Sequence, residues 1–205
     1  MKPWAAFFPD MLVHVYGAPD PLIELELRRA ATEFFKRTRA WMEWIGPVAC
    51  TEGIREYDID KPSGTDVITL EKVTLNNIPV RILSYRNSSI GNTTFVGGVP
   101  GAASPERLTV LLDRDVSTDA RLEIQVSLMP SRVATGLPDL MFEYHADSIV
   151  AGALARLQRI PKQEFTDLQQ SAINAARFEA DIGASAYRAW RGETNVTPRQ
   201  KVNWC

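Results

Sequence analysis

Few residues of this chain have the chemistry that catalysis or metal binding requires. The two histidines are His14 and His145, and no Gly-x-Ser-x-Gly elbow occurs, so a nucleophile activated by a histidine base is not indicated. His145 lies two residues from both Glu143 and Asp147, which suggests a metal site. In a helix, however, residues two apart point away from each other, so Glu143 and Asp147 share a face that excludes the histidine. The sequence therefore does not predict a metal centre.

Other chemical signals are equally incomplete. The Gly-Gly pair at 97–98 lacks the Gly-Lys-Ser/Thr ending of a phosphate-binding loop and the Gly-x-Gly-x-x-Gly spacing of a dinucleotide site. Asp113 and Asp115 have the paired carboxylates of glycoside chemistry, but they flank an arginine in a charged turn. Cys50 and Cys205 are too few for a disulfide framework or a zinc site, and we expect free thiols. We therefore expect a protein that is not an enzyme and has no cofactor.

Composition describes an ordinary globular protein. The chain has 205 residues, of which 45% are hydrophobic and 23% charged, enough for one domain or for one domain carrying a sizeable insertion. The formal net charge is -2, so contact with DNA is expected to be passive at most. Residues 1–16 are apolar but interrupted by prolines, and no apolar run is long enough to span a membrane. We expect a soluble protein made in the cytoplasm.

The first helix is expected to begin at Asp20-Pro21, an N-cap residue followed by a proline suited to the first turn. Apolar residues then recur at spacings of three and four, which places them on one face, and the helix is expected to end before Gly46-Pro47. This face consists of Ile23, Leu27, Ala30, Ala31, Phe34, Phe35, Thr38 and Trp41.

From residue 46 to 138 the apolar period changes from 3.6 to 2, which indicates strands and an antiparallel sandwich or barrel. Asn76-Asn77 is expected to form a hairpin turn, because asparagine tolerates positive φ. Residues 91–105 are rich in glycine and proline and are expected to form a loop. The expected strands are 55–59, 67–75, 78–85, 108–112 and 122–128.

Two more helices follow, one from residue 139 to about 160 and one from about 164 to 191. Tyr144 is expected on the apolar face of the former, and its Gly152 allows a second helix to approach closely. The latter is rich in alanine and is expected to end before Gly192. Its expected apolar face comprises Leu168, Ala172, Ala175, Ala176, Ile182, Ala186 and Tyr187.

These elements predict an α+β protein. A helical bundle of one N-terminal and two C-terminal helices (residues 1–45 and 139–192) would carry a β-rich insertion (46–138) and an extended C-terminal tail (193–205). Aromatic residues gather near helix ends and termini: Trp4, Phe7, Phe8, Trp41, Trp44, Trp190 and Trp204. The first three are expected to hold the N-terminal arm against the bundle. Trp204 lies in a polar tail, so we expect it to anchor a partner.

The order of several segments resembles the head-to-tail adaptor (connector) family of short-tailed bacteriophages, often called tail tubular protein A. The likeness covers most of the chain and is one of order and spacing. It is carried by Gly17-Ala18-Pro19-Asp20-Pro21, Ala30–Phe34, Arg37–Trp41, Tyr57-Asp58-Ile59, Pro62-Ser63-Gly64, Ile149–Leu157 before Pro161, the helix with Phe178 and Ala186, and a Thr-Pro-Arg tail.

This resemblance implies a structural protein of the virion, assembled in the host cytoplasm. Such proteins form a ring, typically of twelve copies, between the portal protein and the tail nozzle protein, and DNA passes through it. The portal or a neighbouring subunit would be bound by Arg188, Arg191, Thr197, Pro198, Arg199, Lys201 and Trp204. A loop facing the nozzle or the lumen would comprise Gly97, Gly98, Val99, Pro100 and Gly101.

Two alternatives remain open at this point. The chain could be a head-completion or tail-completion protein of a long-tailed phage, which neighbouring genes would distinguish. It could also be a β-sandwich module that binds protein or glycan, with the helices as a collar. The strand region is poor in tryptophan, which disfavours a sugar-stacking surface.

Overall fold

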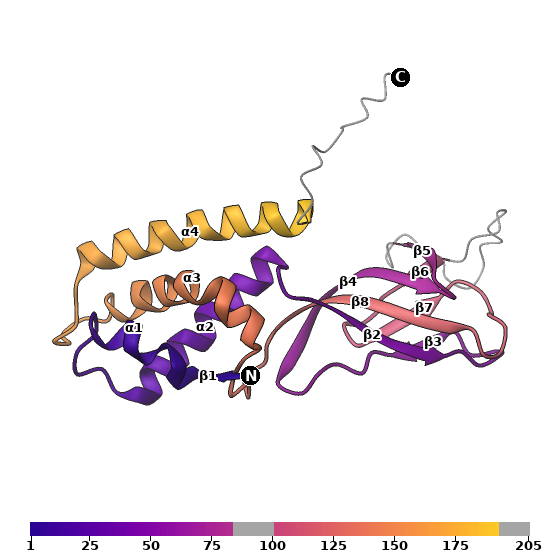
Figure 1. The fold of residues 1–205 in the computed structure, drawn as a ribbon, viewed down its shortest axis with the longest axis horizontal. Helices are drawn as coiled ribbons and strands as arrows, with labels where there is room; N and C mark the ends of the chain where they lie inside the picture. The colour runs from indigo at the N-terminus through magenta and orange to yellow at the C-terminus, as the bar shows by residue number, and fades with distance from the viewer. Residues whose placement is uncertain (84–100, 193–205) are drawn as a thin grey trace, which may run out of the picture. The chain divides into compact units, whose positions relative to one another are not determined.

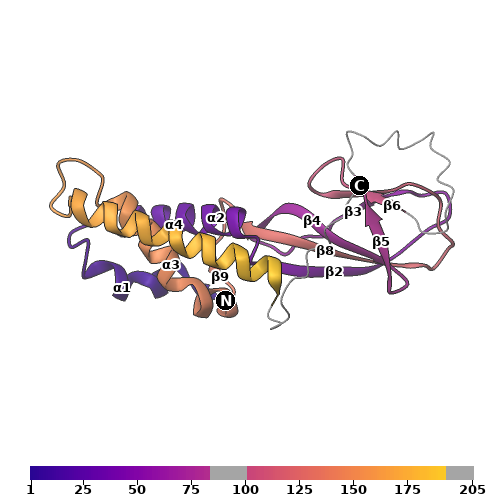
Figure 2. The same cartoon turned by 90° about the horizontal axis from the view of Figure 1, so that it is seen from above.

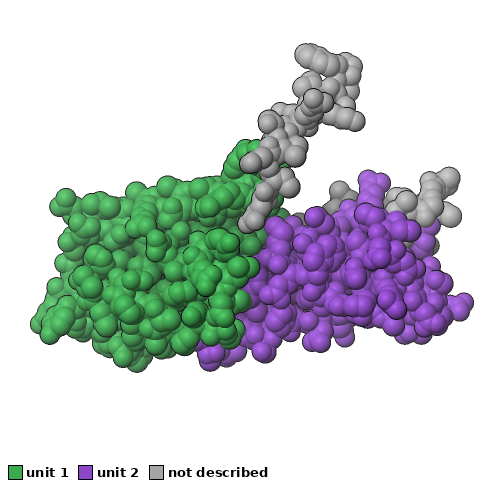
Figure 3. All heavy atoms as spheres, viewed as in Figure 1, with its two compact units in different colours: residues 1–40, 137–205 green, residues 41–136 purple. Residues whose placement is uncertain are grey.

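The computed structural model describes residues 1–83 and 101–192. The chain divides into two compact units: unit 1 is Met1–Ala40 with Leu137–Cys205, and unit 2 is Trp41–Gly136 (Figure 3). The described part is mixed α+β, which confirms the expected class (Figure 1). Its helices are η1 (Trp4–Phe7), α1 (Phe8–Leu12), α2 (Asp20–Thr38), α3 (Asp139–Leu157) and α4 (Leu168–Arg191). Its strands are β1 (Lys2–Pro3), β2 (Met42–Ala49), β3 (Glu56–Asp58), β4 (Thr65–Leu75), β5 (Ile78–Ile82), β6 (Gly101–Ala103), β7 (Thr109–Leu112), β8 (Arg121–Pro130) and β9 (Gly136–Leu137).

The N-terminal arm packs into the core of unit 1. Trp4 and Phe7 of η1 are buried, and their ring centroids lie 5.9 Å apart. Phe7 also meets Phe142 of α3 edge to face at 4.7 Å. Burying a large aromatic side chain contributes roughly 1.5–3 kcal/mol, so these contacts hold the arm in place. The expectation that Trp4 and Phe7 fasten the arm is confirmed.

Helix α2 begins one residue before the predicted first turn and ends earlier than predicted. Its N-cap is Pro19 and not Asp20, and no side chain caps this end, so the prediction of Asp20 as the N-cap is wrong. Pro21 follows Asp20 in its first turn, and the predicted apolar face from Ile23 to Phe35 is buried. The helix stops at Thr38 because Arg39 adopts the left-handed conformation (φ 53°), and the Arg39 N–H donates to the Phe35 carbonyl at 2.9 Å. The prediction that the helix continues to just before Gly46 is therefore wrong.

Helices α3 and α4 lie side by side and run antiparallel (Figures 1 and 2). From Ser171 to Asp181 along α4, the hydrogen-bonded partners on α3 move back from Ala155 to Ser148. The two helices are close together at Gly152, where a Cβ would lie 2.7 Å from the Phe178 ring. Gly152 therefore permits the close helix approach that the sequence predicted.

Strands β2 to β8 of unit 2 form one curled seven-stranded sheet, in the order β2-β8-β4-β5-β6-β7-β3. Strand β8 lies between β2 and β4, and both neighbours are antiparallel to it (Figure 2). Its alternating side chains Leu122, Ile124, Val126 and Leu128 are fully buried, as the period of two predicted. Asn76 and Asn77 link β4 to β5 with positive φ, which confirms the hairpin.

Two strands contradict the sequence-based expectation. Residues 42–45, expected to end the first helix, belong to β2 (Met42–Ala49), because this segment pairs with β8. Gly46 has φ 108°, and a Cβ there would meet the Leu122 carbonyl oxygen at 2.8 Å, so glycine is required beside β8. Gly101 lies in β6 and is buried, so it does not belong to an exposed loop. Strand β6 pairs parallel to β5, although the sequence predicted only antiparallel pairing.

Candidate partner-binding surface

The C-terminal end of α4 carries two of the predicted partner-binding residues, Arg188 and Arg191. The Arg188 guanidinium donates to the Ser185 hydroxyl at 3.4 Å. Arg191 is half-buried, and its Nε atom is buried without a hydrogen-bond partner among the described residues. Both guanidinium groups therefore have N–H donors without a hydrogen-bond partner among the described residues.

Two large aromatic residues stand beside these arginines. Tyr187 is 52% exposed and Trp190 is 73% exposed, and their ring centroids lie 6.4 Å apart. Tryptophan, tyrosine and arginine are the residues most enriched where protein interfaces concentrate their binding energy. Residues 182–191 contain no acidic side chain, so this end of α4 is both aromatic and basic. We call Tyr187, Arg188, Trp190 and Arg191 the basic helix end.

The beginning of α3 has the opposite charge. Asp139, Glu143 and Asp147 recur every fourth residue and are exposed, so they form one acidic line along the helix. Leu140 (56% exposed) and Tyr144 (68% exposed) follow the same spacing beside them. Asp139, Leu140, Glu143, Tyr144 and Asp147 are called the acidic helix face. Tyr144 was predicted on the buried face of α3, and that prediction is wrong.

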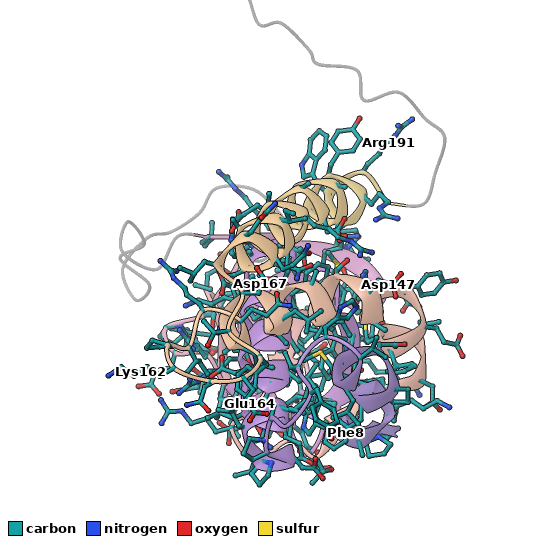
Figure 4. The ribbon with its side chains drawn as sticks, turned by 90° about the vertical axis from the view of Figure 1, so that its left-hand side faces the viewer. Phe8, Asp147, Lys162, Glu164, Asp167 and Arg191 are labelled. Atoms are coloured by element: carbon teal, nitrogen blue, oxygen red, sulfur yellow. The ribbon has the colours of Figure 1, made fainter. Side chains whose placement is uncertain are left out.

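Because α3 and α4 are antiparallel, these two surfaces lie at the same end of unit 1. Figure 4 shows Arg191 at the end of α4 and Asp147 on the outer side of α3. Asp147 is met by Arg177 at 3.8 Å, an exposed pair that contributes little. Glu143 has no ion pair among the described residues.

His145 of α3 packs against α2. Its ring centroid lies 5.0 Å from that of Phe34 and 5.7 Å from that of Phe35, and its Nδ1 atom is buried without a hydrogen-bond partner. Burial lowers the pKa of His145, and the positive charge of Arg188 lowers it further. His145 is therefore a neutral packing residue near pH 7.

The buried side of α4 differs from the predicted one. Ser171, Phe178, Ile182 and Ser185 are buried, whereas Leu168, Ala172, Ala175, Ala176 and Tyr187 are exposed and Ala186 is half-buried. Buried serines are compatible with this contact because α3 supplies acceptors: the Ser171 hydroxyl donates to the Ala155 carbonyl at 2.6 Å. An alanine-rich helix has small apolar residues on more than one face, so its period does not identify the buried one.

A groove of about 620 Å³ lies between α2, α3 and α4 on another side of unit 1. Its charged residues are mostly neutralised inside the chain. Arg156 pairs with Glu33, and Arg37 holds Glu179 through two hydrogen bonds of 2.6 and 2.7 Å. The charged side chains of this groove are therefore largely paired with opposite charges of the same chain, unlike the arginines of the basic helix end.

The remaining predicted site residues divide into two groups. Gly101 is buried in β6, where a Cβ would meet Leu83 at 2.5 Å, so it does not face a partner. The others lie outside the described residues: Gly97, Gly98, Val99, Pro100, Thr197, Pro198, Arg199, Lys201 and Trp204.

The predicted free thiol and the metal question concern other parts of the chain. Cys50 is a free, buried cysteine, and burial raises the pKa of its thiol, which disfavours a reactive thiolate. Within residues 1–83 and 101–192, no three His, Cys, Asp or Glu side chains gather as they would around a metal ion. Over the same residues, no helix combines the length and apolar character needed to cross a membrane.

Comparisons with known proteins add no identification. No protein-family model matches the chain, and no curated protein matches it.

Sequence reasoning named Arg188 and Arg191 but missed the side chains that complete the surface. Tyr144 and Tyr187 were missed because their spacing of three and four assigned them to apolar faces, and Leu140 was not assigned to any face. The signal that could have found them is the mixture of aromatic and charged residues at adjacent positions, Glu143-Tyr144 and Tyr187-Arg188.

Proposed function

We propose that this chain is a structural protein of a bacteriophage virion, a ring-forming adaptor that joins the portal protein to the tail nozzle protein and forms part of the DNA conduit. In this proposal the long helices act as a bundle, and the curled sheet acts as an inserted sandwich-like domain. The protein contributes binding surfaces and no catalysis. DNA passes through the assembled ring without being held, which agrees with a formal net charge of -2.

The observation that carries the proposal is the basic helix end. Trp190 is a large apolar residue left 73% exposed, and Arg188 lies beside it with no carboxylate partner among the described residues. Exposed aromatic and arginine side chains together are typical of binding surfaces in assemblies. The chain continues from this point into residues 193–205, to which the proposal assigns the contact with the portal protein.

Further support comes from the construction of unit 1. The N-terminal arm, α2 and α3 bury a dense aromatic core around Phe34 and Phe7. A rigid core is what a subunit needs to present a helix end at a fixed position in an assembly. The proposal assigns the nozzle contact to the segment from Gly97 to Pro100, which lies outside the described residues.

The proposal is tested by co-expressing this chain with the portal protein of the same genome and measuring the mass of each protein alone and together. A complex with about one copy per portal subunit is expected. A variant truncated after Gly192 should lose most of the portal binding, while its helix content stays unchanged. If the two full-length proteins stay separate at every concentration and salt tested, the adaptor function is wrong, and a glycan and protein binding screen of unit 2 follows.

A further inference from the structure

We propose that the basic helix end of one copy binds the acidic helix face of a neighbouring copy. This inference rests on the proposed ring, and it names the two surfaces that make the ring contact. The occupant of each surface is therefore a second copy of this chain.

Charge complementarity is the first argument. The basic helix end holds Arg188 and Arg191, and the acidic helix face holds Asp139, Glu143 and Asp147. The helix dipole accounts for Asp139 in the first turn of α3 and for the two arginines in the last turn of α4, but Glu143 and Asp147 lie beyond that first turn. The dipole does not explain why large apolar side chains stand exposed among these charges. Interfaces combine such apolar anchors with flanking charges of opposite sign on the two partners.

The matching of apolar groups is the second argument. Each surface pairs two exposed large side chains with its charges: Tyr187 and Trp190 on one, Leu140 and Tyr144 on the other. Each pair is spaced as neighbours on one helix face, three residues apart on α4 and four apart on α3. Two short helix faces of this kind can pack against each other, with the charges at their borders.

When a copy uses its basic helix end on one neighbour and its acidic helix face on another neighbour, the contacts run head to tail. Such contacts close into a ring when the rotation between copies allows it. A surface that bound only itself would stop at a dimer. The pairing of unlike surfaces is thus the arrangement that a ring requires.

Charge reversal tests the contact directly. One variant carries Arg188→Glu and Arg191→Glu, and a second carries Glu143→Lys and Asp147→Lys. Each variant alone places like charges against each other, and we expect its self-association to weaken by about tenfold or more. In an equal mixture, every contact between unlike variants again joins opposite charges, so complexes that contain both variants should form.

The matched control is Arg159→Glu with Lys162→Glu. It makes the same change of charge as the variant with Arg188→Glu and Arg191→Glu, but at the other end of the α3–α4 pair. Self-association is measured by mass photometry and sedimentation, with far-UV circular dichroism to verify that each variant is folded. The control should assemble like the unchanged protein. Raising the salt concentration should weaken the unchanged protein's assembly, because screening acts on exposed charges.

The outcomes separate this inference from the proposed function. If both reversed variants assemble alone as well as the unchanged protein, or if mixing them restores nothing, the inference is wrong. If the arginine variant assembles normally but loses portal binding, the basic helix end faces the portal; the inference then fails while the adaptor function stands. If the unchanged protein neither self-associates nor binds the portal, both are wrong.

Discussion

Replacing Gly152 by alanine tests the close packing of α3 against α4. A Cβ at this position would lie 2.7, 2.8 and 2.9 Å from three atoms of the Phe178 ring. Contacts this short force the ring or the helix to move, and overpacking of this kind costs about 1–3 kcal/mol. Alanine is better than glycine in a helix by about 1 kcal/mol, which offsets part of the loss. We expect a net destabilisation of about 1 kcal/mol.

Gly183 provides the matched control on α4. No atom lies within 4 Å of a Cβ built there, so Gly183→Ala adds helix propensity without any clash. We expect it to stabilise unit 1 by up to about 1 kcal/mol. The two substitutions are chemically identical and both glycines are helical, so the difference between their effects isolates the contact with Phe178.

The assay is urea unfolding followed by circular dichroism at 222 nm, since the helices of the described residues belong to unit 1. Adding Phe178→Leu to Gly152→Ala should recover part of the loss, which a double-mutant cycle detects as coupling between the two positions. If Gly152→Ala and Gly183→Ala stabilised the protein equally, the packing described for α3 and α4 would be refuted.

Three further predictions concern side chains on or beside α4. Ser171→Ala removes the 2.6 Å hydrogen bond to Ala155 and should destabilise the protein by about 1 kcal/mol in the same urea assay. The pKa of His145 is lowered in the folded state, so the unfolded state binds the proton more tightly, and stability should fall as pH drops below about 6.5. His145→Leu should reduce this fall, measured as the unfolding free energy from pH 7 to 5. If the dependence of the unfolding free energy on pH were unchanged in the variant, His145 would not be the group that causes it. Trp190→Ala should change the unfolding free energy by less than about 0.5 kcal/mol, because the side chain is 73% exposed. The same substitution should weaken assembly about 30-fold in the mass measurement. A loss of stability without a loss of assembly would argue against an interface role for Trp190.

Patterns within short segments predicted much of the fold. The strict alternation from Leu122 to Leu128 predicted β8, and the Asn76-Asn77 pair predicted the hairpin that follows β4. The start of α2, within one residue of the predicted first turn, and the end of α4 before Gly192 followed from residues suited to helix ends. In each case the determining interactions lie within a few residues of each other, so the local sequence contains them.

The candidate surface was predictable only in part. Arg188 and Arg191 were expected to bind a partner, whereas Tyr144 and Tyr187 were assigned to cores. Periodicity reports which residues share a face, but it does not report whether another element covers that face. The resemblance to head-to-tail adaptors supplied the expected function, and no protein-family model or curated protein adds to it.

By itself the sequence determined the α+β class, most strands, the hairpin and the limits of several helices, because these depend on local periodicity and on residues suited to turns and caps. Tertiary structure decided that residues 42–49 form β2, since pairing with β8 outweighs the local apolar pattern. It also decided which side of α4 is buried, because Ser171 can be buried only where the Ala155 carbonyl accepts its hydrogen. Exposure of Tyr144 and Trp190 likewise depends on where the neighbouring helices end. Such long-range contacts produce no periodic pattern in the local sequence, so the sequence alone does not predict them.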